Sequence, residues 1–182
     1  ALLFYLGVNA KIEKLEHHNL FFDEDIEVHT EEIYKSPSWP SKPLFYTCCP
    51  SKTDKSIAPN GKENIFLLMP LAPGLEDNEM LREKYFNIMI SRLEKYCQQD
   101  ILKHIEYKRS YCIEDFKNDY QSLNGTGFSI SPIFRQSAWF RFHNKSEDFK
   151  NLYFAGAGSH PGAGVPGVVS SAKVIENIIS NE

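Results

Sequence analysis

The residues best suited to chemistry lie near the carboxy-terminus, where five of the ten glycines fall between Gly156 and Gly167. Glycine tolerates positive φ and lets the backbone approach a ligand closely. Apolar residues recur at helical intervals from Val165 onward, and Pro166 suits a first helical turn. The free N–H groups of such a helix start attract anionic or electron-rich ligand atoms. The sequence therefore predicts a ligand-binding loop that leads into a helix.

Familiar active-site motifs do not account for this loop. A phosphate-binding P-loop needs Gly-Lys-Ser or Gly-Lys-Thr before its helix, and the sequence has neither. The stretch from Gly162 to Gly167 fits G-x-G-x-x-G, but the expected strand ends several residues earlier and a proline interrupts the motif. A serine hydrolase would combine Ser159 or Ser170 with His160, but no G-x-S-x-G nucleophile elbow is present. We expect His160 to brace the loop, and the catalytic residues stay unknown.

The elements around the loop are predicted from apolar patterns. Leu152 to Ala155 is a short apolar run typical of a buried strand. With this strand before the loop and an apolar-faced helix after it, a plain glycine-rich linker is disfavoured. Arg141 precedes the strand, and three roles are open for it: orienting the loop, contacting a ligand, or stacking on Trp139 or Phe140.

Earlier in the chain, the pattern predicts a sheet covered by one long helix. Glu79–Gln98 is the clearest helix, and its apolar face is expected to belong to the core. That face consists of Leu81, Tyr85, Met89, Leu93 and Tyr96. The predicted strands are Leu2–Val8, Leu15–Phe22, Leu44–Cys49, Asn64–Leu71 and Lys103–Tyr111. Shorter helices are expected within Asp23–Lys35 and over Ile113–Tyr120, and a loop over Leu123–Ser137. Asn64–Leu71 should run antiparallel to Leu44–Cys49.

Apolar side chains on these strands exceed what one helix can cover. The aromatic residues among them are Phe4, Phe45, Tyr46 and Phe66. Part of the excess is ordinary core, and the sequence does not divide the two. An uncovered apolar sheet face would suit a water-insoluble chain, because burial returns about 0.8 kcal/mol per CH₂-sized group.

Two histidines and four cysteines are the candidate metal ligands. His17 and His18 fall within a predicted strand, where adjacent residues face opposite sides, so at most one imidazole should face a given cavity. The cysteines form no C-x-x-C pair and have no histidine cluster nearby in the sequence. They are Cys48, Cys49, Cys97 and Cys112. We expect reduced, mostly buried thiols and no metal site.

The composition is that of a globular chain. Its 182 residues are 42% hydrophobic and 24% charged, and the net charge of −4 disfavours nucleic acid as a partner. No apolar run is long enough to span a membrane, and the amino-terminal residues lack the basic region of a signal peptide. We expect a cytoplasmic protein. The absence of an initiating Met fits a chain that begins within a longer protein.

The carboxy-terminal third resembles a known family. Gln136–Asn144 and Asn151–Val168, which contains Phe-Ala-Gly-Ala-Gly-Ser-His-Pro-Gly-Ala-Gly, closely resemble the signature of bacterial carotenoid desaturases. These phytoene and dehydrosqualene desaturases are FAD-dependent flavoproteins of the amine-oxidase-like group. His17–Phe22, Pro50–Gly61 and Asp115–Tyr120 look similar to the family as well, so the resemblance covers almost the whole chain.

The resemblance implies an α+β or α/β fold in two parts. Residues 1–130 would form a mixed substrate-binding sheet with its covering helix. Residues 131–182 would be the returning strand, loop and helix that complete an FAD-binding domain. The amino-terminal Rossmann unit of that domain is not in this sequence. We therefore expect the chain alone to be inactive and to hold no FAD tightly.

The resemblance also implies where the cofactor FAD would bind. The glycine loop would contact it through Gly156, Ala157 and Gly158, and the helix start through Val165, Pro166, Gly167 and Val168, of which Pro166 has no N–H. Relatives outside the desaturases often carry an acidic residue where this chain has Ala157. The substrate would be an apolar isoprenoid of the phytoene or dehydrosqualene class, reached by peripheral contact with the cytoplasmic membrane.

Other functions stay open beside the desaturase interpretation. A non-catalytic module that binds an apolar ligand or a partner would fit the missing nucleotide-binding unit. A flavin-dependent carotenoid isomerase or oxidase would share the same motifs. The motifs fix neither the substrate's chain length nor the number of desaturation steps, the final electron acceptor or the oligomeric state.

Overall fold

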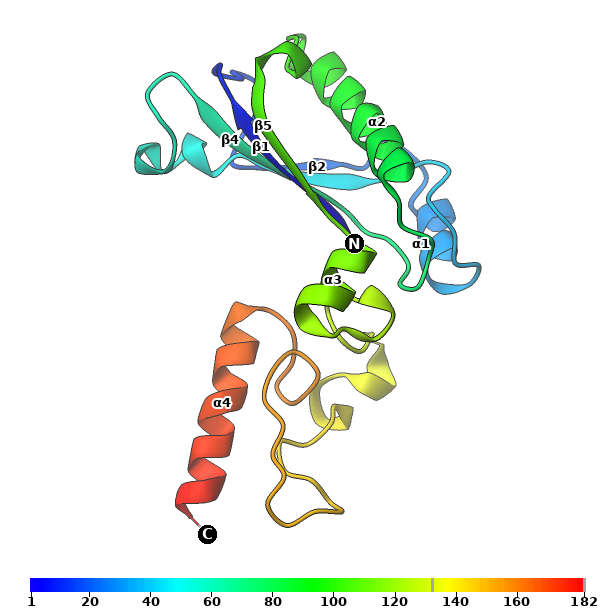
Figure 1. Cartoon of the computed structure of the whole chain (residues 1–182), viewed down its shortest axis with the longest axis vertical. Helices are drawn as coiled ribbons and strands as arrows, with labels where there is room; N and C mark the ends of the chain where they lie inside the picture. The colour runs from blue at the N-terminus through cyan, green and yellow to red at the C-terminus, as the bar shows by residue number, and fades with distance from the viewer. Residues whose placement is uncertain (132, 182) are drawn as a thin grey trace. The chain divides into compact units, whose positions relative to one another are not determined.

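A five-stranded sheet occupies the first of two units in the computed structural model, which describes residues 1–131 and 133–181 (Figure 1). The units comprise residues 1–125 and 126–182. The strands are β1 (Leu2–Val8), β2 (His18–Phe21), β3 (Phe45–Cys48), β4 (Glu63–Met69) and β5 (Ile105–Tyr111). Their order in the sheet is β2-β3-β4-β1-β5, and β1 is flanked on both sides. Every described pairing within this sheet is antiparallel, so the expected mixed sheet is wrong, whereas the antiparallel β3–β4 pair is confirmed.

Side-chain alternation divides the sheet into two faces. In β1, Leu2, Phe4, Leu6 and Val8 are buried, and the residues between them are partly or fully exposed. The same alternation continues in β4. Because successive side chains of a strand point to opposite faces, one face of the sheet is a core face and the other is not.

Helix α2 (Glu79–Cys97) lies along the core face (Figure 1). It begins at Asn78, whose side chain accepts a hydrogen bond from the Leu81 N–H at 2.9 Å, and ends at Gln98 in the left-handed conformation. Its buried residues are Tyr85, Phe86, Met89, Ile90, Leu93 and Cys97. Leu93 is followed on the buried stripe by Cys97, four residues later. Tyr96, expected in the core, is therefore at the edge and 52% exposed.

The smaller elements of this unit lie close to their predicted bounds. Helix α1 (Ile26–Tyr34) begins at the N-cap Asp25, and α3 (Ile113–Tyr120) has the predicted limits. β2 is shorter than predicted, because the chain enters the sheet only at His18. Before β5, a 3₁₀ turn occupies Leu102–His104.

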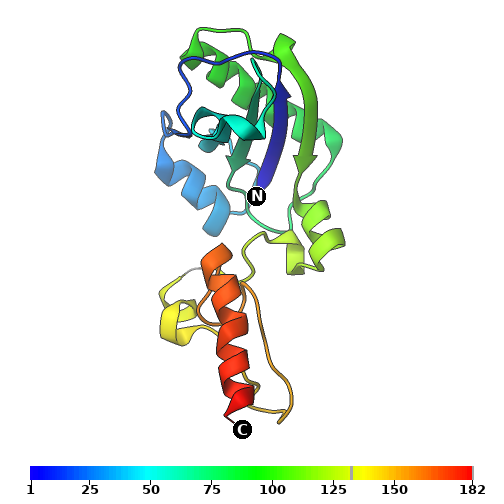
Figure 2. The same cartoon turned by 90° about the vertical axis from the view of Figure 1, so that its left-hand side faces the viewer.

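The second unit contains α4 (Val165–Ser180) and irregular segments that lie beside it (Figure 2). The expected strand Leu152–Ala155 is wrong, since only Tyr153 pairs, in an isolated antiparallel bridge with Lys145. A strand needs a neighbour to accept its backbone hydrogen bonds, and the described part of this unit provides only single bridges. The buried residues described here are Arg141, Asn144, Ser159, Gly162 and Ser171, none of them a large apolar residue. Within the described residues, no helix combines the length and the apolar character needed to cross a bilayer.

Candidate functional site

The Arg141 side chain holds the glycine loop in place through hydrogen bonds to backbone carbonyls. Its Nε donates to the Ala157 carbonyl at 3.1 Å, Nη2 donates to the same oxygen, and Nη1 donates to the Gln136 carbonyl at 3.3 Å. The side chain is buried, whereas the neighbouring Trp139 is largely exposed. Of the three roles open to Arg141 from the sequence, the structure shows the first: it orients the loop.

Asn144 joins the two ends of the same loop. Its Nδ2 donates to the carbonyls of Phe154 at 3.0 Å and His160 at 2.8 Å, and lies 3.3 Å from Ser159 Oγ. The Phe154 N–H donates back to the Asn144 carbonyl at 2.8 Å. The side chain is 4% exposed, so these bonds are shielded from water. Sequence reasoning missed this role, and its only signal was the position of Asn144 at the end of the Gln136–Asn144 motif.

Two serines complete the polar support of the loop. The Gly156 N–H donates to Ser171 Oγ at 2.8 Å, and Ser171 Oγ donates to the Val168 carbonyl at 2.6 Å. Ser159 Oγ donates to the Gly156 carbonyl at 3.2 Å, so this buried hydroxyl holds backbone. The backbone N–H of His160 donates to the Phe142 carbonyl at 2.9 Å, which agrees with the expected bracing role.

Two glycines are required here for different reasons. Gly156 has φ +119°, and a Cβ built on it meets nothing within 4 Å, so the backbone at this point faces open space. A Cβ on Gly167 would lie 2.6 Å from the Gly162 carbonyl oxygen. Gly167 is thus needed for the close packing of the loop on the start of α4, and Gly156 is the position that a ligand can approach.

The start of α4 offers fewer donors than expected. The N-cap is Gly164, which has no side chain to accept a hydrogen bond from the first-turn N–H groups. The Val168 N–H donates to the Gly164 carbonyl at 2.9 Å, so the prediction that it is free for a ligand is wrong. The first-turn N–H groups of Val165 and Gly167 have no acceptor within the helix, because the residues four positions before them lie outside it.

A cavity of about 810 Å³ adjoins the loop within the second unit. Phe154, Ala155, Gly158 and Ser159 line it on the loop side, and residues 142, 143 and 145–148 line much of the rest. This volume lies within the range of small-molecule and cofactor sites. Among the residues predicted to contact a cofactor, Gly158 lines this cavity, whereas Gly156, Ala157 and the helix start do not.

Helix α4 presents apolar residues to solvent beside this loop. Val165 is 79% exposed, and Val169 and Ile179 are also exposed. The helix buries a serine, Ser171, and none of its apolar side chains completely. The apolar face predicted from the sequence exists, and the described residues of the second unit leave it exposed.

The face of the sheet opposite α2 carries a row of rings. Tyr5 lies 5.2 Å from Phe66, Phe66 lies 6.4 Å from Tyr46, and Tyr46 lies 5.9 Å from His18, measured between ring centroids. His17 extends the row, with its ring 4.2 Å from that of His18. Tyr5 is 42% exposed. We refer to these residues as the aromatic row.

The structure thereby divides the apolar strand residues that the sequence left undivided. Phe4 and Phe45 are buried on the core face, where Phe4 packs 5.0 Å from Phe86 and Phe45 packs 4.4 Å from Phe21. Tyr46 and Phe66 lie on the other face with Tyr5. The predicted apolar face outside the helical cover therefore consists of the aromatic row together with neighbouring aliphatic side chains.

The sequence of the chain is similar to those of known carotenoid desaturases. No protein-family model matches the chain. It is 38% identical over 166 residues to a carotenoid 3,4-desaturase from Haloarcula japonica, which covers 91% of this chain and 34% of that protein. It is 35% identical over 182 residues to a 4,4'-diapophytoene desaturase (4,4'-diaponeurosporene-forming) from Staphylococcus aureus, covering 96% of this chain and 36% of that protein. The chain belongs to the carotenoid desaturase family. It spans about a third of the length of these desaturases.

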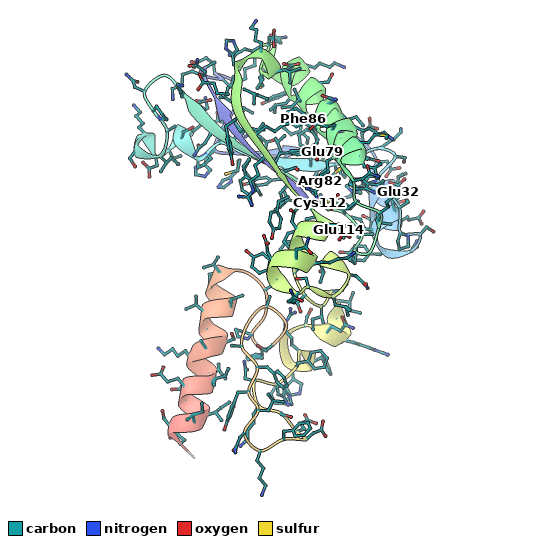
Figure 3. All side chains as sticks on the ribbon, in the orientation of Figure 1. Glu32, Glu79, Arg82, Phe86, Cys112 and Glu114 are labelled. Atoms are coloured by element: carbon teal, nitrogen blue, oxygen red, sulfur yellow. The ribbon has the colours of Figure 1, made fainter. Side chains whose placement is uncertain are left out.

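A partly buried ion-pair network that the sequence did not reveal supports the first unit. Arg82 on α2 donates to Asp77 through Nε at 2.7 Å and Nη2 at 2.6 Å, and Nη2 also lies 2.8 Å from Asp115. Figure 3 shows Arg82 near Cys112 and Glu114, where α2 and α3 begin. Burial alone would raise the pKa of Asp77, but hydrogen bonds from Arg82 and the Glu114 N–H lower it below its ordinary value.

The four cysteines of the chain are free, as expected. Burial raises the pKa of Cys49 and of Cys97 to about 11, and burial followed by the nearby Asp77 raises that of Cys112 to about 12. These three thiols are therefore neutral and unreactive at physiological pH. Cys48 differs, because it is only partly buried.

Cys48 lies beside two histidines, contrary to the sequence prediction. A ring nitrogen of His17, a ring nitrogen of His18 and the Cys48 Sγ lie within 4.8 Å of one another. The alternation argument does not apply to His17, because β2 begins at His18. Cys48 was missed because it is directly opposite His18 in the β2–β3 pairing and distant from it in sequence.

Proposed function

We propose that this chain is the carboxy-terminal part of an FAD-dependent desaturase that introduces double bonds into an apolar isoprenoid precursor of carotenoids. The observation that carries the proposal is the glycine loop, held open by Arg141, Asn144 and Ser171 beside a cavity of about 810 Å³. The names of its relatives, carotenoid 3,4-desaturase and 4,4'-diapophytoene desaturase, support the reaction class.

The residues present fit a flavin cofactor at this loop. The open space at Gly156 would let the backbone come close to the cofactor, and Gly158 faces the cavity. The Ala157 carbonyl is taken by Arg141, which leaves the N–H and methyl group of Ala157 for contact. At the helix start, the N–H groups of Val165 and Gly167 would stabilise negative charge, while Pro166 and Val168 would contribute shape. FAD, when bound, supplies the electron-accepting chemistry.

The exposed valines of α4 support the proposal that the second unit completes an FAD-binding domain. Val165 and Val169 form an apolar surface on a helix whose neighbours in this chain do not cover it. We assign that surface to contact with the dinucleotide-binding unit, within the two thirds of the desaturases' length that this chain does not match. A chain without this contact should bind only part of the cofactor and hold it weakly.

The aromatic row is the proposed substrate surface. Tyr5, Tyr46 and Phe66 offer a line of rings on the sheet face opposite α2. An extended isoprenoid laid on this face would be held by area and shape, since each buried CH₂-sized group returns about 0.8 kcal/mol. Such a substrate dissolves in membranes, which is why we place the enzyme peripherally at the cytoplasmic membrane.

The test uses the full-length protein that contains this chain. Phytoene and the shorter dehydrosqualene are supplied separately in liposomes, and pigments are extracted and separated by chromatography. We expect coloured, conjugated products from at least one of the two. Failure to convert either, together with rapid oxidation of a small polar amine, would overturn the desaturase assignment in favour of an amine oxidase.

A further inference from the structure

We propose that His17, His18 and Cys48 form a binding site for Zn²⁺ at the end of the aromatic row, independent of the flavin loop. Two imidazole nitrogens and one thiolate sulfur are ligands typical of zinc, and they disfavour Mg²⁺ and Ca²⁺, which take oxygen ligands. The three ligand atoms already lie within 4.8 Å of one another. The site would leave one tetrahedral position for water.

The distance that the ligands must close is small. Zn–N and Zn–S bonds of about 2.0 and 2.3 Å place tetrahedral ligand atoms roughly 3.3 to 3.6 Å apart. The three atoms would therefore approach by at most about 1.2 to 1.5 Å from their present separation of up to 4.8 Å. Rotation of the side chains can supply this movement, because His18 is exposed and His17 and Cys48 are only partly buried.

Hydroxyl groups lie within hydrogen-bond distance of Nδ1 in both imidazoles, which would leave Nε2 for a metal. His17 Nδ1 lies 2.6 Å from Thr53 Oγ1, and that hydroxyl gives its own proton to the Pro50 carbonyl at 3.3 Å. Thr53 Oγ1 therefore accepts from His17 Nδ1–H, which leaves the Nε2 lone pair for a metal. Such a bond at the other ring nitrogen is the usual support of a metal-bound histidine.

Tyr46 plays the same part for the second imidazole. Its hydroxyl lies 2.5 Å from His18 Nδ1. When the Tyr46 oxygen accepts from His18 Nδ1–H, the Nε2 lone pair of His18 is left for a metal. Tyr46 thus orients one imidazole as Thr53 orients the other.

The backbone holds the ligands in register across two strands. His18 and Cys48 are directly opposite in the antiparallel β2–β3 pair, and the Cys49 N–H donates to the His17 carbonyl at 2.8 Å. β2 is an outer strand of the sheet, paired only with β3. A bound Zn²⁺ would therefore cross-link this outer strand to its neighbour, and its first effect would be on stability.

The experiment uses the 182-residue chain in reducing buffer with Co²⁺ as a spectroscopic probe for Zn²⁺. We expect one Co²⁺ per chain, a thiolate-to-cobalt charge-transfer band, the visible bands of tetrahedral cobalt, and displacement by Zn²⁺. Cys48→Ser should abolish the charge-transfer band, and His18→Gln should weaken binding at least tenfold. Thr53→Val, which removes only an orienting hydroxyl, should weaken it by about tenfold. His143→Gln, at an exposed histidine of the second unit, is the matched control and should change nothing.

Thermal unfolding gives a second readout that is independent of the spectrum. Zn²⁺ should raise the melting temperature of the chain and EDTA should reverse the rise, because the ion binds the folded arrangement. Circular dichroism of each variant without metal establishes that it folds. The proposal is overturned if the charge-transfer band is absent, if it persists in Cys48→Ser, or if the Zn²⁺-dependent shift persists in folded His18→Gln.

Discussion

The two units of this chain are built from the same kinds of residue but stabilised in opposite ways. The first unit packs Phe4, Met89 and Leu93 into an apolar core between the sheet and helix α2. In the second, polar side chains such as Arg141 and Asn144 are buried, while apolar residues of α4 face outward. Burial of apolar area is the dominant stabilising contribution in folding, so the first unit has what an autonomous domain needs.

This difference shows how structure and function are distributed along the chain. The second unit uses its buried hydrogen bonds to fix a loop, and its apolar face is left for another surface. The first unit has its apolar core on one side of the sheet and the aromatic row on the other. Substitutions in the two units should therefore have different effects on stability and on the loop.

Loss of the Asp77–Arg82 pair should affect the first unit most. Asp77→Asn removes the buried carboxylate that accepts from Nε and Nη2 of Arg82 and leaves Asp115 as the remaining partner, so the cost should be about 3 kcal/mol, the lower end for a broken buried pair. The pKa of Asp77 is lower in the folded state, so its stabilising contribution is complete above its ordinary pKa and is lost as pH falls through the folded-state value.

Urea unfolding at neutral and acidic pH measures this contribution. Asp77→Asn should be much less stable than the unaltered chain at pH 7, and the difference should shrink at acidic pH. Asp148→Asn, an exposed aspartate of the second unit, is the control and should follow the unaltered chain. A constant difference from pH 7 down to acid unfolding would contradict the assigned role.

Two isoleucines on helices test the contrast between the units with the same substitution. Ile90 on α2 is 2% exposed, and Ile179 on α4 is 53% exposed. Ile90→Ala should cost about 2–5 kcal/mol of unfolding free energy, because it leaves a cavity in the core. Ile179→Ala should cost less than about 0.5 kcal/mol in this chain. Equal losses in urea unfolding would mean that α4 is packed as firmly as α2.

Removal of the Arg141 fork should loosen the loop without unfolding the first unit. Arg141→Ala leaves the Ala157 carbonyl without its donor, at a cost of about 1–3 kcal/mol to local stability. Hydrogen exchange followed by mass spectrometry should show faster exchange in peptides covering 154–168 and unchanged exchange in β1 and α2. Arg135→Ala, at an exposed neighbouring arginine, is the control. Faster exchange throughout the chain would contradict a role confined to the loop.

The fold could be predicted from the sequence wherever one element determines its own pattern. The alternation of β1 and β4 and the stripe of α2 specify their type and buried face. The wrong predictions concern features that depend on a neighbouring segment of the chain. Leu152–Ala155 has the composition of a strand, yet no neighbouring strand pairs with more than Tyr153 in the described residues. Sheet direction likewise depends on how strands meet, so the mixed sheet was expected where antiparallel pairs formed.

The residues of the candidate site also include some that could be predicted from the sequence and some that could not. The glycine loop could be recognised because backbone freedom is encoded by the residue itself. Asn144 and Ser171 could not, because a buried amide or hydroxyl resembles a surface one until its partners are known. The ring pair of His17 and His18 was excluded by strand alternation, which fails one residue before the strand begins.

The account is tested most directly by one measurement made on two variants of the full-length protein: flavin content and pigment pattern after incubation with phytoene or dehydrosqualene. In Gly167→Val, the new side chain would collide with the Gly162 carbonyl and displace the loop, so flavin content should fall while the protein stays folded. In Phe66→Ala, flavin content should be unchanged and the distribution of products should shift, because the aromatic row has lost a ring. Unchanged flavin and turnover in Gly167→Val, or loss of flavin in a folded Phe66→Ala, would contradict the assignment of cofactor to the loop and substrate to the sheet.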